Sequence, residues 1–154
     1  MSNLLAAIAG VTNASEPLPG LVTGGQPTGA HITALKAAGC EVVVDNRDPM
    51  EPRPFDEPAT VRAAGMEYVN VPIVHGAATT DTMRRMHEVV RGLKARKALF
   101  HCSSGNRTAA ALIPSLMLDQ GMDEQAAVET AIRIGMRSAE LMELALEYVR
   151  TRKG

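Results

Sequence analysis

Apolar runs of strand length recur along the first two thirds of the chain. Four of these runs are rich in β-branched or aliphatic residues and end at glycine, proline or polar residues, a pattern typical of buried strands. The predicted strands are 21–23, 42–44, 68–71 and 98–100. The run from Val42 to Val44 has no polar position, so we expect it in the middle of a sheet with both faces buried.

Segments with apolar residues every three or four positions lie between and after these strands. Each begins at a capping residue or a proline, or stops at a glycine, as helices do. The predicted helices are 4–9, 30–38, 58–64, 81–95, 107–120, 124–134 and 139–153. Pro114 lies inside one of them, where its missing N–H predicts a kink or a lost backbone bond. Residues 12–19 are expected to form turns, and residues 48–57, rich in proline and charge, an exposed loop.

Strand and helix alternate up to about residue 100, and only helices follow. This order predicts a single α/β domain over residues 1–154, with a mostly parallel sheet of four to five strands flanked by helices. Ligands of such sheets bind at the carboxyl ends of the strands. Arg47, the loop 72–79 and Cys102 each follow a predicted strand, so we expect them to converge on one site.

Composition narrows the possible classes of protein. The chain has 154 residues, of which 45% are hydrophobic and 3% aromatic, so the core must be built from aliphatic side chains and methionine. The net charge of -1 and the lack of a long apolar run argue against a nucleic-acid partner and a membrane span. With only Cys40 and Cys102, and no basic residue in the first ten positions, we expect a reducing, cytoplasmic location.

The segment from Phe100 to Thr108 carries the clearest chemistry. It joins a predicted strand to a helix, and its N–H groups, with the helix dipole, form a cradle for an anion. In that field the thiol of Cys102 should ionise and act as a nucleophile, and Arg107 can bind two oxygens of an oxyanion. The hydroxyl of Thr108 can donate to the sulfur. The residues expected to bind the oxyanion are Ser103, Ser104, Gly105, Asn106 and Arg107.

This segment resembles the signature loop of the cysteine-dependent protein tyrosine and dual-specificity phosphatases, although four residues separate Cys102 from Arg107 here and five do so in that family. The short loop is similar to a bacterial branch, the phosphatase-like domain of beta-lactamase-hydrolase-like proteins, as is the segment 22–27 with its Gly-Gln-Pro. The resemblance implies a dual-specificity-phosphatase-like fold and hydrolysis of phosphomonoesters through a cysteinyl-phosphate. It implies no cofactor, and a phosphorylated protein or small molecule as the substrate.

Three alternatives to this phosphatase remain open. The loop is also similar to that of rhodaneses, so the chain could be a sulfurtransferase with a persulfide on Cys102; the Gly-His-Ile-Pro-Gly segment expected after Arg47 is missing, however. The second alternative is a catalytically weak module that only binds phosphate. The third is a buried and inert Cys102, which would leave the serines, the glycine and Arg107 unexplained.

The proton donor for the leaving group has three candidate assignments. Phosphoester cleavage needs an acid, and the resemblance implies an aspartate on the loop after the third strand. Val74 occupies that position. His75 can donate a proton near neutral pH and is the first candidate, Asp81 at the start of a helix is the second, and the absence of an acid is the third.

Three further residues are expected to support the loop from behind. His101 precedes the cysteine and would orient it as a neutral ring, or would simply be a core histidine. Arg47 would reach the site or pair with Asp45, Asp48 or Glu51, and Gln26 would touch the loop or satisfy a turn. The four histidines lack the spacing and the carboxylate support of metal ligands, so we expect no metal site.

Overall fold

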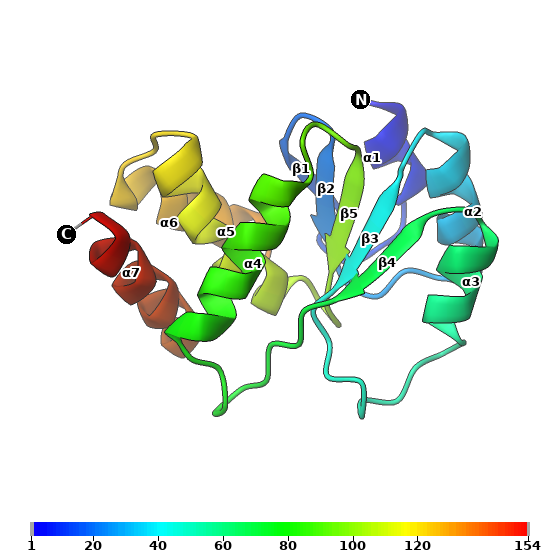
Figure 1. The fold of residues 1–154 in the computed structure, drawn as a ribbon. Coiled ribbons are helices and arrows are strands. Elements are labelled where there is room, and N and C mark those ends of the chain that lie inside the picture. The colour runs from blue at the N-terminus through cyan, green and yellow to red at the C-terminus, as the bar shows by residue number, and fades with distance from the viewer. Residues whose placement is uncertain (1, 154) are drawn as a thin grey trace.

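A five-stranded sheet runs through the centre of the computed structural model, which describes residues 2–153 (Figure 1). The strands lie in the order β1-β2-β5-β3-β4. They are β1 (Ser15–Leu18), β2 (Leu21–Gly24), β3 (Val42–Asp45), β4 (Glu67–Asn70) and β5 (Ala98–His101). Only the edge strand β1 is antiparallel to its neighbour, and the other pairs are parallel. The predicted α/β class with a mostly parallel sheet is therefore confirmed.

Helices cover both faces of the sheet (Figure 1). On one face lie α1 (Asn3–Ala7), α2 (Gly29–Ala37) and α3 (Glu57–Ala63), and on the other α4 (Thr80–Gly92), α5 (Asn106–Pro114), α6 (Glu124–Ile134) and α7 (Ala139–Lys153). Side chains alternate between the faces along each strand. Val43 and Leu99 pack in the core under α1–α3, whereas Val44 and Phe100 pack in the core under α4–α7. This explains why the central strands read as uninterrupted apolar runs.

The strand ends define where a site can form. The parallel register places His101, the last residue of β5, level with Gly24 of β2 on one side and Asp45 of β3 on the other. Cys102 therefore leaves the sheet at its centre, between two neighbouring strand ends. This is the edge at which ligands of parallel sheets bind.

Residues 12–19 do not form turns only, as the sequence predicted, because they include β1. The strand is half-buried along its whole length, so it has no alternation of apolar and polar residues to reveal it. Gly20, with a φ of 80°, closes the tight turn that folds Leu18 back against Leu21. The local sequence signal for this hairpin is therefore the glycine of its turn, because the strand itself has no alternating pattern.

Two helix ends also differ from the prediction. Helix α4 stops at Gly92 instead of near residue 95, because Lys94 and Ala95 adopt left-handed backbone conformations with φ of 50° and 70°. Helix α5 stops at Pro114 and continues as a π-helix over Ser115–Asp119, so the lost backbone bond expected at this proline appears as a change of helix type. Within residues 2–153 no helix is both long and apolar enough to cross a membrane.

Candidate active site

Cys102 is the first residue after β5, and its side chain is 1% exposed. The loop that follows reaches the N-terminus of α5 within four residues. Gly105 caps that helix with a φ of 99°, a left-handed conformation that favours glycine, and its N–H donates to the Cys102 sulfur over 3.1 Å. The loop therefore turns at least this N–H toward the sulfur, which is the arrangement that an anion cradle requires.

Two forces act on the Cys102 thiol in opposite directions. Burial raises its pKa, whereas the backbone N–H and hydroxyl of Thr108, the charge of Arg107 and the N–H of Gly105 lower it, and the net shift is downward. A buried thiol with this many donors favours its ionised form. The direction is the one that a thiolate nucleophile requires.

The loop after Cys102 is held from behind by Gln26, which precedes α2, and by Asn13, which precedes β1. The carbonyl of Ser103 accepts from the backbone N–H of Gln26 over 3.0 Å, and the carbonyl of Ser104 accepts from the Asn13 side chain over 2.8 Å. Both carbonyls therefore have a donor from outside the loop. Gly25 has to be a glycine for this, because a Cβ there would lie 2.5 Å from the Ser103 oxygen. The Gly-Gly-Gln segment thus shapes the loop after Cys102 from behind.

Arg107 is held by a carboxylate that the sequence did not single out for this role. Its Nη1 donates to Glu51 Oε2 over 2.7 Å and its Nη2 to Glu51 Oε1 over 3.0 Å, while Nη1 also faces the Ile73 carbonyl at 3.2 Å. The hydrogen bond from Arg107 is the main reason that the pKa of Glu51 falls to about 2. Glu51 is therefore ionised at neutral pH and forms a fixed pair with the arginine.

Arg47 and Gln26 form a second layer behind this pair. The Arg47 guanidinium donates to Glu51 at 3.4 Å, to the Gln26 side-chain oxygen at 2.5 Å and to the Pro52 carbonyl at 2.6 Å. Of the two alternatives for Arg47, the ion pair is formed, and it supports the carboxylate that holds Arg107. Residues 48–57 are thus not simply an exposed loop, because they fold back and bring Glu51 to the site.

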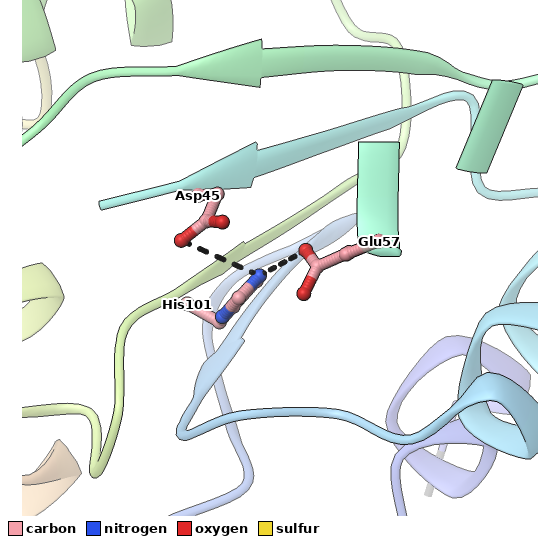
Figure 2. Close-up of side chains that lie close together, drawn as sticks. All are labelled: Asp45, Glu57 and His101. Carbon is pink, nitrogen blue, oxygen red and sulfur yellow. Dashed lines mark hydrogen bonds and ion pairs between the residues drawn. The ribbon is translucent and has the colours of Figure 1, made fainter. Parts of the chain in front are cut away.

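His101 lies in a buried cluster with two carboxylates, Asp45 and Glu57 (Figure 2). Its Nε2 is 2.5 Å from Glu57 Oε2 and 3.8 Å from Asp45 Oδ1, and its Nδ1 is 3.1 Å from the Cys102 carbonyl. Burial opposes protonation of the ring, but Glu57 and Asp45 raise the pKa of His101 above its ordinary value. Both ring nitrogens face acceptors, so the surroundings favour the protonated ring over the neutral ring that the sequence predicted. No local pattern indicates this, because Glu57 lies 44 positions away from His101.

This cluster is also the place where the described residues come nearest to a metal site, since ligand atoms of Asp45, Glu57 and His101 lie within 4.8 Å of one another. Every one of them already has a partner. Asp45 accepts from the Arg47 backbone N–H at 2.9 Å and from the Tyr68 hydroxyl at 2.7 Å, and Glu57 accepts from Gln26 and from the His101 ring. The expectation that no histidine has carboxylate support was wrong for His101, but the carboxylates bind a proton-bearing ring and neighbouring donors.

The two candidate acids have different surroundings. Asp81 lies in the first turn of α4 and pairs with Arg84 at 2.8 Å and with Arg85 at 3.6 Å. His75 is exposed on the loop between β4 and α4, and the next residue of that loop, Gly76, donates its N–H to Glu140 at 3.1 Å. No hydrogen bond or ion pair joins the His75 ring to Cys102 or Arg107 within residues 2–153. Of the two, only His75 has a side chain that is not tied to a helix terminus.

A buried cysteine thiol and an arginine on one strand–loop–helix unit, in a sheet of this order, define a cysteine-dependent phosphatase fold. The chain belongs to the family described as "DSP-PTPase phosphatase fused to NAD+ Kinase", whose model matches residues 11–147. The assignment to the protein tyrosine and dual-specificity phosphatase superfamily from the loop is thereby confirmed. No curated protein matches the chain.

Solved structures share the fold. A DUF442 protein from Shewanella putrefaciens CN-32 has a TM-score of 0.81 at 22% identity, over 97% of this chain and 99% of that one. The core catalytic domain of the PP-IP phosphatase SIW14 from S. cerevisiae has a TM-score of 0.76 at 15% identity, over 90% and 86% of the two chains. TpbA from P. aeruginosa has a TM-score of 0.67 at 24% identity, over 91% and 84%. At these identities the likeness shows the fold and not the substrate.

Proposed function

We propose that this protein hydrolyses phosphomonoesters through a phosphorylated Cys102. The observation that carries the proposal is the environment of the Cys102 sulfur. The sulfur is buried, it accepts a hydrogen bond from the Gly105 N–H, and the charge of Arg107 helps to lower its pKa. The family match supports a phosphatase over a rhodanese-like sulfurtransferase. The substrate would be a phosphorylated protein or small molecule.

In the first step the Cys102 thiolate attacks phosphorus. The S–P bond forms as the bond to the leaving oxygen breaks, and that oxygen departs with the electron pair. Water then attacks phosphorus, the P–S bond breaks, and the sulfur keeps its electron pair as a thiolate while one proton of the water passes to solvent. The N–H groups of residues 103–107 stabilise the charge that builds on the phosphoryl oxygens in both steps.

The contacts of Arg107 determine which of its edges meets the substrate. A guanidinium has five N–H donors. Nη1 uses its two on Glu51 and the Ile73 carbonyl, and Nη2 uses one on Glu51. The second Nη2 donor and the Nε donor lie on one edge and would bind two phosphoryl oxygens. Glu51 thus fixes the arginine with its binding edge presented.

Protonation of the leaving group falls to His75 in this mechanism. Glu51 cannot supply a proton, because its pKa of about 2 keeps it ionised. Asp81 is paired with Arg84 and Arg85, and its carboxylate serves the start of α4. His75 is exposed on its loop and is not held in place by Cys102 or Arg107, so its help should be weak. Esters whose leaving group departs readily as an anion, such as aryl phosphates, should for that reason be the best substrates.

The test is a paired assay of the purified protein on an aryl phosphate and on thiosulfate with cyanide. We expect phosphate release and no thiocyanate. Thiocyanate without phosphate release would make the protein a sulfurtransferase. If neither product forms while inorganic phosphate or vanadate binds, the protein is a phosphate-binding module.

The role of His75 is tested separately by kcat/KM on esters that span several units of leaving-group pKa. General acid catalysis is typically worth about 10²–10⁴-fold. His75→Ala should cost little on activated aryl esters and much more on alkyl esters, because only the latter need the proton. If Asp81→Asn shows that dependence instead, Asp81 is the acid, and a loss with His75→Ala that is equal on all esters would remove His75 from the mechanism.

A further inference from the structure

The start of α7 is bonded to both loops that the proposed mechanism uses. Asn106, the first residue of α5, accepts through its Oδ1 from the backbone N–H groups of Arg137 at 2.6 Å and of Ser138 at 3.0 Å. Two residues further on, Glu140 Oε1 accepts from the backbone N–H of Gly76 at 3.1 Å, where the loop that enters α4 passes the start of α7 (Figure 1). One helix end is therefore joined to the loop of the nucleophile and to the loop of the candidate proton donor.

The segment 74–78, which carries His75, is a tight turn with few other attachments. Two N–H groups within the segment donate to the Val74 carbonyl, at 3.0 and 2.9 Å, so these bonds close the turn on itself. Nothing lies within 4 Å of a Cβ at Gly76, which adopts a left-handed conformation with a φ of 82°. Among residues 2–153, the bond to Glu140 is the only hydrogen bond that joins this segment to another element. The position of the tip of the turn therefore depends on Glu140.

Glu140 itself belongs to a firmly packed element. Leu141 and Ala145 of α7 are fully buried in the core under α4–α7. Ser138 caps the helix, because its Oγ accepts from the Leu141 N–H at 3.1 Å. A side chain on a packed helix is held more precisely than one on a loop, and a bond from N–H to a carboxylate is stronger than a bond between neutral groups. Glu140 can therefore restrain a turn that has no other anchor.

We propose that Glu140 is a positioning residue, whose carboxylate holds the turn 74–78 against the start of α7 and so keeps His75 at a fixed position relative to the loop after Cys102. Glu140 exchanges no proton with the substrate; it acts by restricting the turn. The proposal rests on the proposed function for the proton that His75 gives to the leaving group, whereas the restraint on the turn exists in the protein without substrate.

The first test measures the restraint itself, by hydrogen exchange of the Gly76 amide. Glu140→Ala should speed this exchange by about three- to tenfold, the effect of losing one hydrogen bond. Glu140→Gln removes the same charge but keeps an oxygen as the acceptor, so it should stay close to the wild-type rate. Glu143→Ala is the matched control, because it removes an exposed carboxylate three positions further along the same helix. An unchanged exchange rate in Glu140→Ala would overturn the proposal.

The second test reads the consequence for catalysis from kcat/KM on alkyl and aryl phosphates. Glu140→Ala should lower kcat/KM on alkyl esters by about three- to tenfold and change it little on activated aryl esters, because only the former need the proton. Glu140→Gln should restore the rate on alkyl esters. In the His75→Ala background, Glu140→Ala should have no further effect on either class of ester.

The other outcomes of the kinetic test are equally informative. Equal losses on both classes of ester, or equal losses with and without the His75 ring, would overturn the proposal, because Glu140 would then act by a route that does not include His75. A loss in Glu140→Gln as large as that in Glu140→Ala would also overturn it, because the charge or a proton of the carboxylate would then be what matters. If no ester is hydrolysed but the Gly76 exchange responds to Glu140→Ala, the proposed function fails and the restraint on the turn stands.

Discussion

The two cysteines of this chain are equally hidden from solvent, yet their surroundings shift the pKa values of their thiols in opposite directions. Cys40 and Cys102 are each 1% exposed, and each lies next to a central strand of the sheet. Burial raises the pKa of Cys40. Its thiol donates to the Val42 carbonyl over 3.4 Å, and this carbonyl carries no charge. For Cys102 the donors of the loop and the charge of Arg107 outweigh burial.

The difference lies in the end of the strand at which each cysteine is placed. Cys40 precedes β3, on the side where strands begin and the neighbouring α2 ends. Cys102 follows β5, where a helix begins and its free N–H groups point back at the sulfur. Burial alone therefore does not distinguish a reactive cysteine from an inert one in this fold; the direction of the adjoining helix does.

The largest effect expected from this comparison is on turnover. Cys102→Ser should lower kcat/KM on aryl phosphates by at least about 10³-fold, because a hydroxyl in the same cradle is a far weaker nucleophile at neutral pH. Cys40→Ala should leave kcat/KM unchanged, because Cys40 packs in the core on the α1–α3 side of the sheet. Substantial activity in Cys102→Ser would show that the cradle is not the reaction centre.

Alkylation measures the same contrast without turnover. At pH 6 iodoacetamide should modify Cys102 on the order of 100-fold faster than Cys40, since only the thiolate reacts. Inorganic phosphate or vanadate should protect Cys102 and leave Cys40 unaffected. Mass spectrometry of both cysteine peptides gives the two rates in one experiment, and similar rates would contradict a preformed anion cradle.

The shape of the cradle can be changed without touching either cysteine. Gly25→Ala would place a Cβ 2.5 Å from the Ser103 carbonyl oxygen, so the loop must shift away from β2. We expect a loss in kcat/KM of at least about tenfold, because small displacements of positioning groups are costly in catalysis. Gly29→Ala is the control, because nothing lies within 4 Å of a Cβ at that position. Equal activity in the two variants would mean that the support from behind has no bearing on the loop.

The sequence predicted the elements whose signals are local. The valines of β3, the Thr28 cap of α2 and the loop from Cys102 to Arg107 each carry their own pattern of apolar, capping or small residues, and that pattern is visible in the sequence alone. Strand β1 was missed because a half-buried edge strand has no such pattern.

The supporting residues of the site could not be predicted in the same way. Glu51 and Glu57 lie in a stretch rich in proline and charge, where carboxylates are usually solvated, and their partners Arg107 and His101 are more than forty positions away. The pairing of Asn46 with Thr108 likewise spans 62 positions. Contacts of this kind follow from how the sheet brings strand ends together, which no local pattern records.

The smallest expected effect concerns Glu51, the carboxylate that holds Arg107. Glu51 acts through Arg107, and its pKa is lowered from 4.5 to about 2, mainly by the hydrogen bond from that arginine. Between these two values Glu51 is ionised in the folded protein and protonated in the unfolded one, so unfolding takes up a proton. The stabilisation is fully present above about pH 4.5 and is lost as the pH falls toward about 2.

Glu51→Gln should therefore flatten the dependence of the unfolding free energy on pH in this window, at a cost near neutral pH of about 1 kcal/mol or less. The matched control is Glu41→Gln, which removes the exposed carboxylate next to Cys40 and should keep the wild-type slope. Denaturant unfolding at pH values between 2.5 and 6 gives both slopes. If Glu51→Gln keeps the wild-type slope, the carboxylate does not hold Arg107 in solution. The orientation of the arginine must then come from the Ile73 carbonyl and the loop itself, and Cys102 would face a less constrained charge than the structure shows.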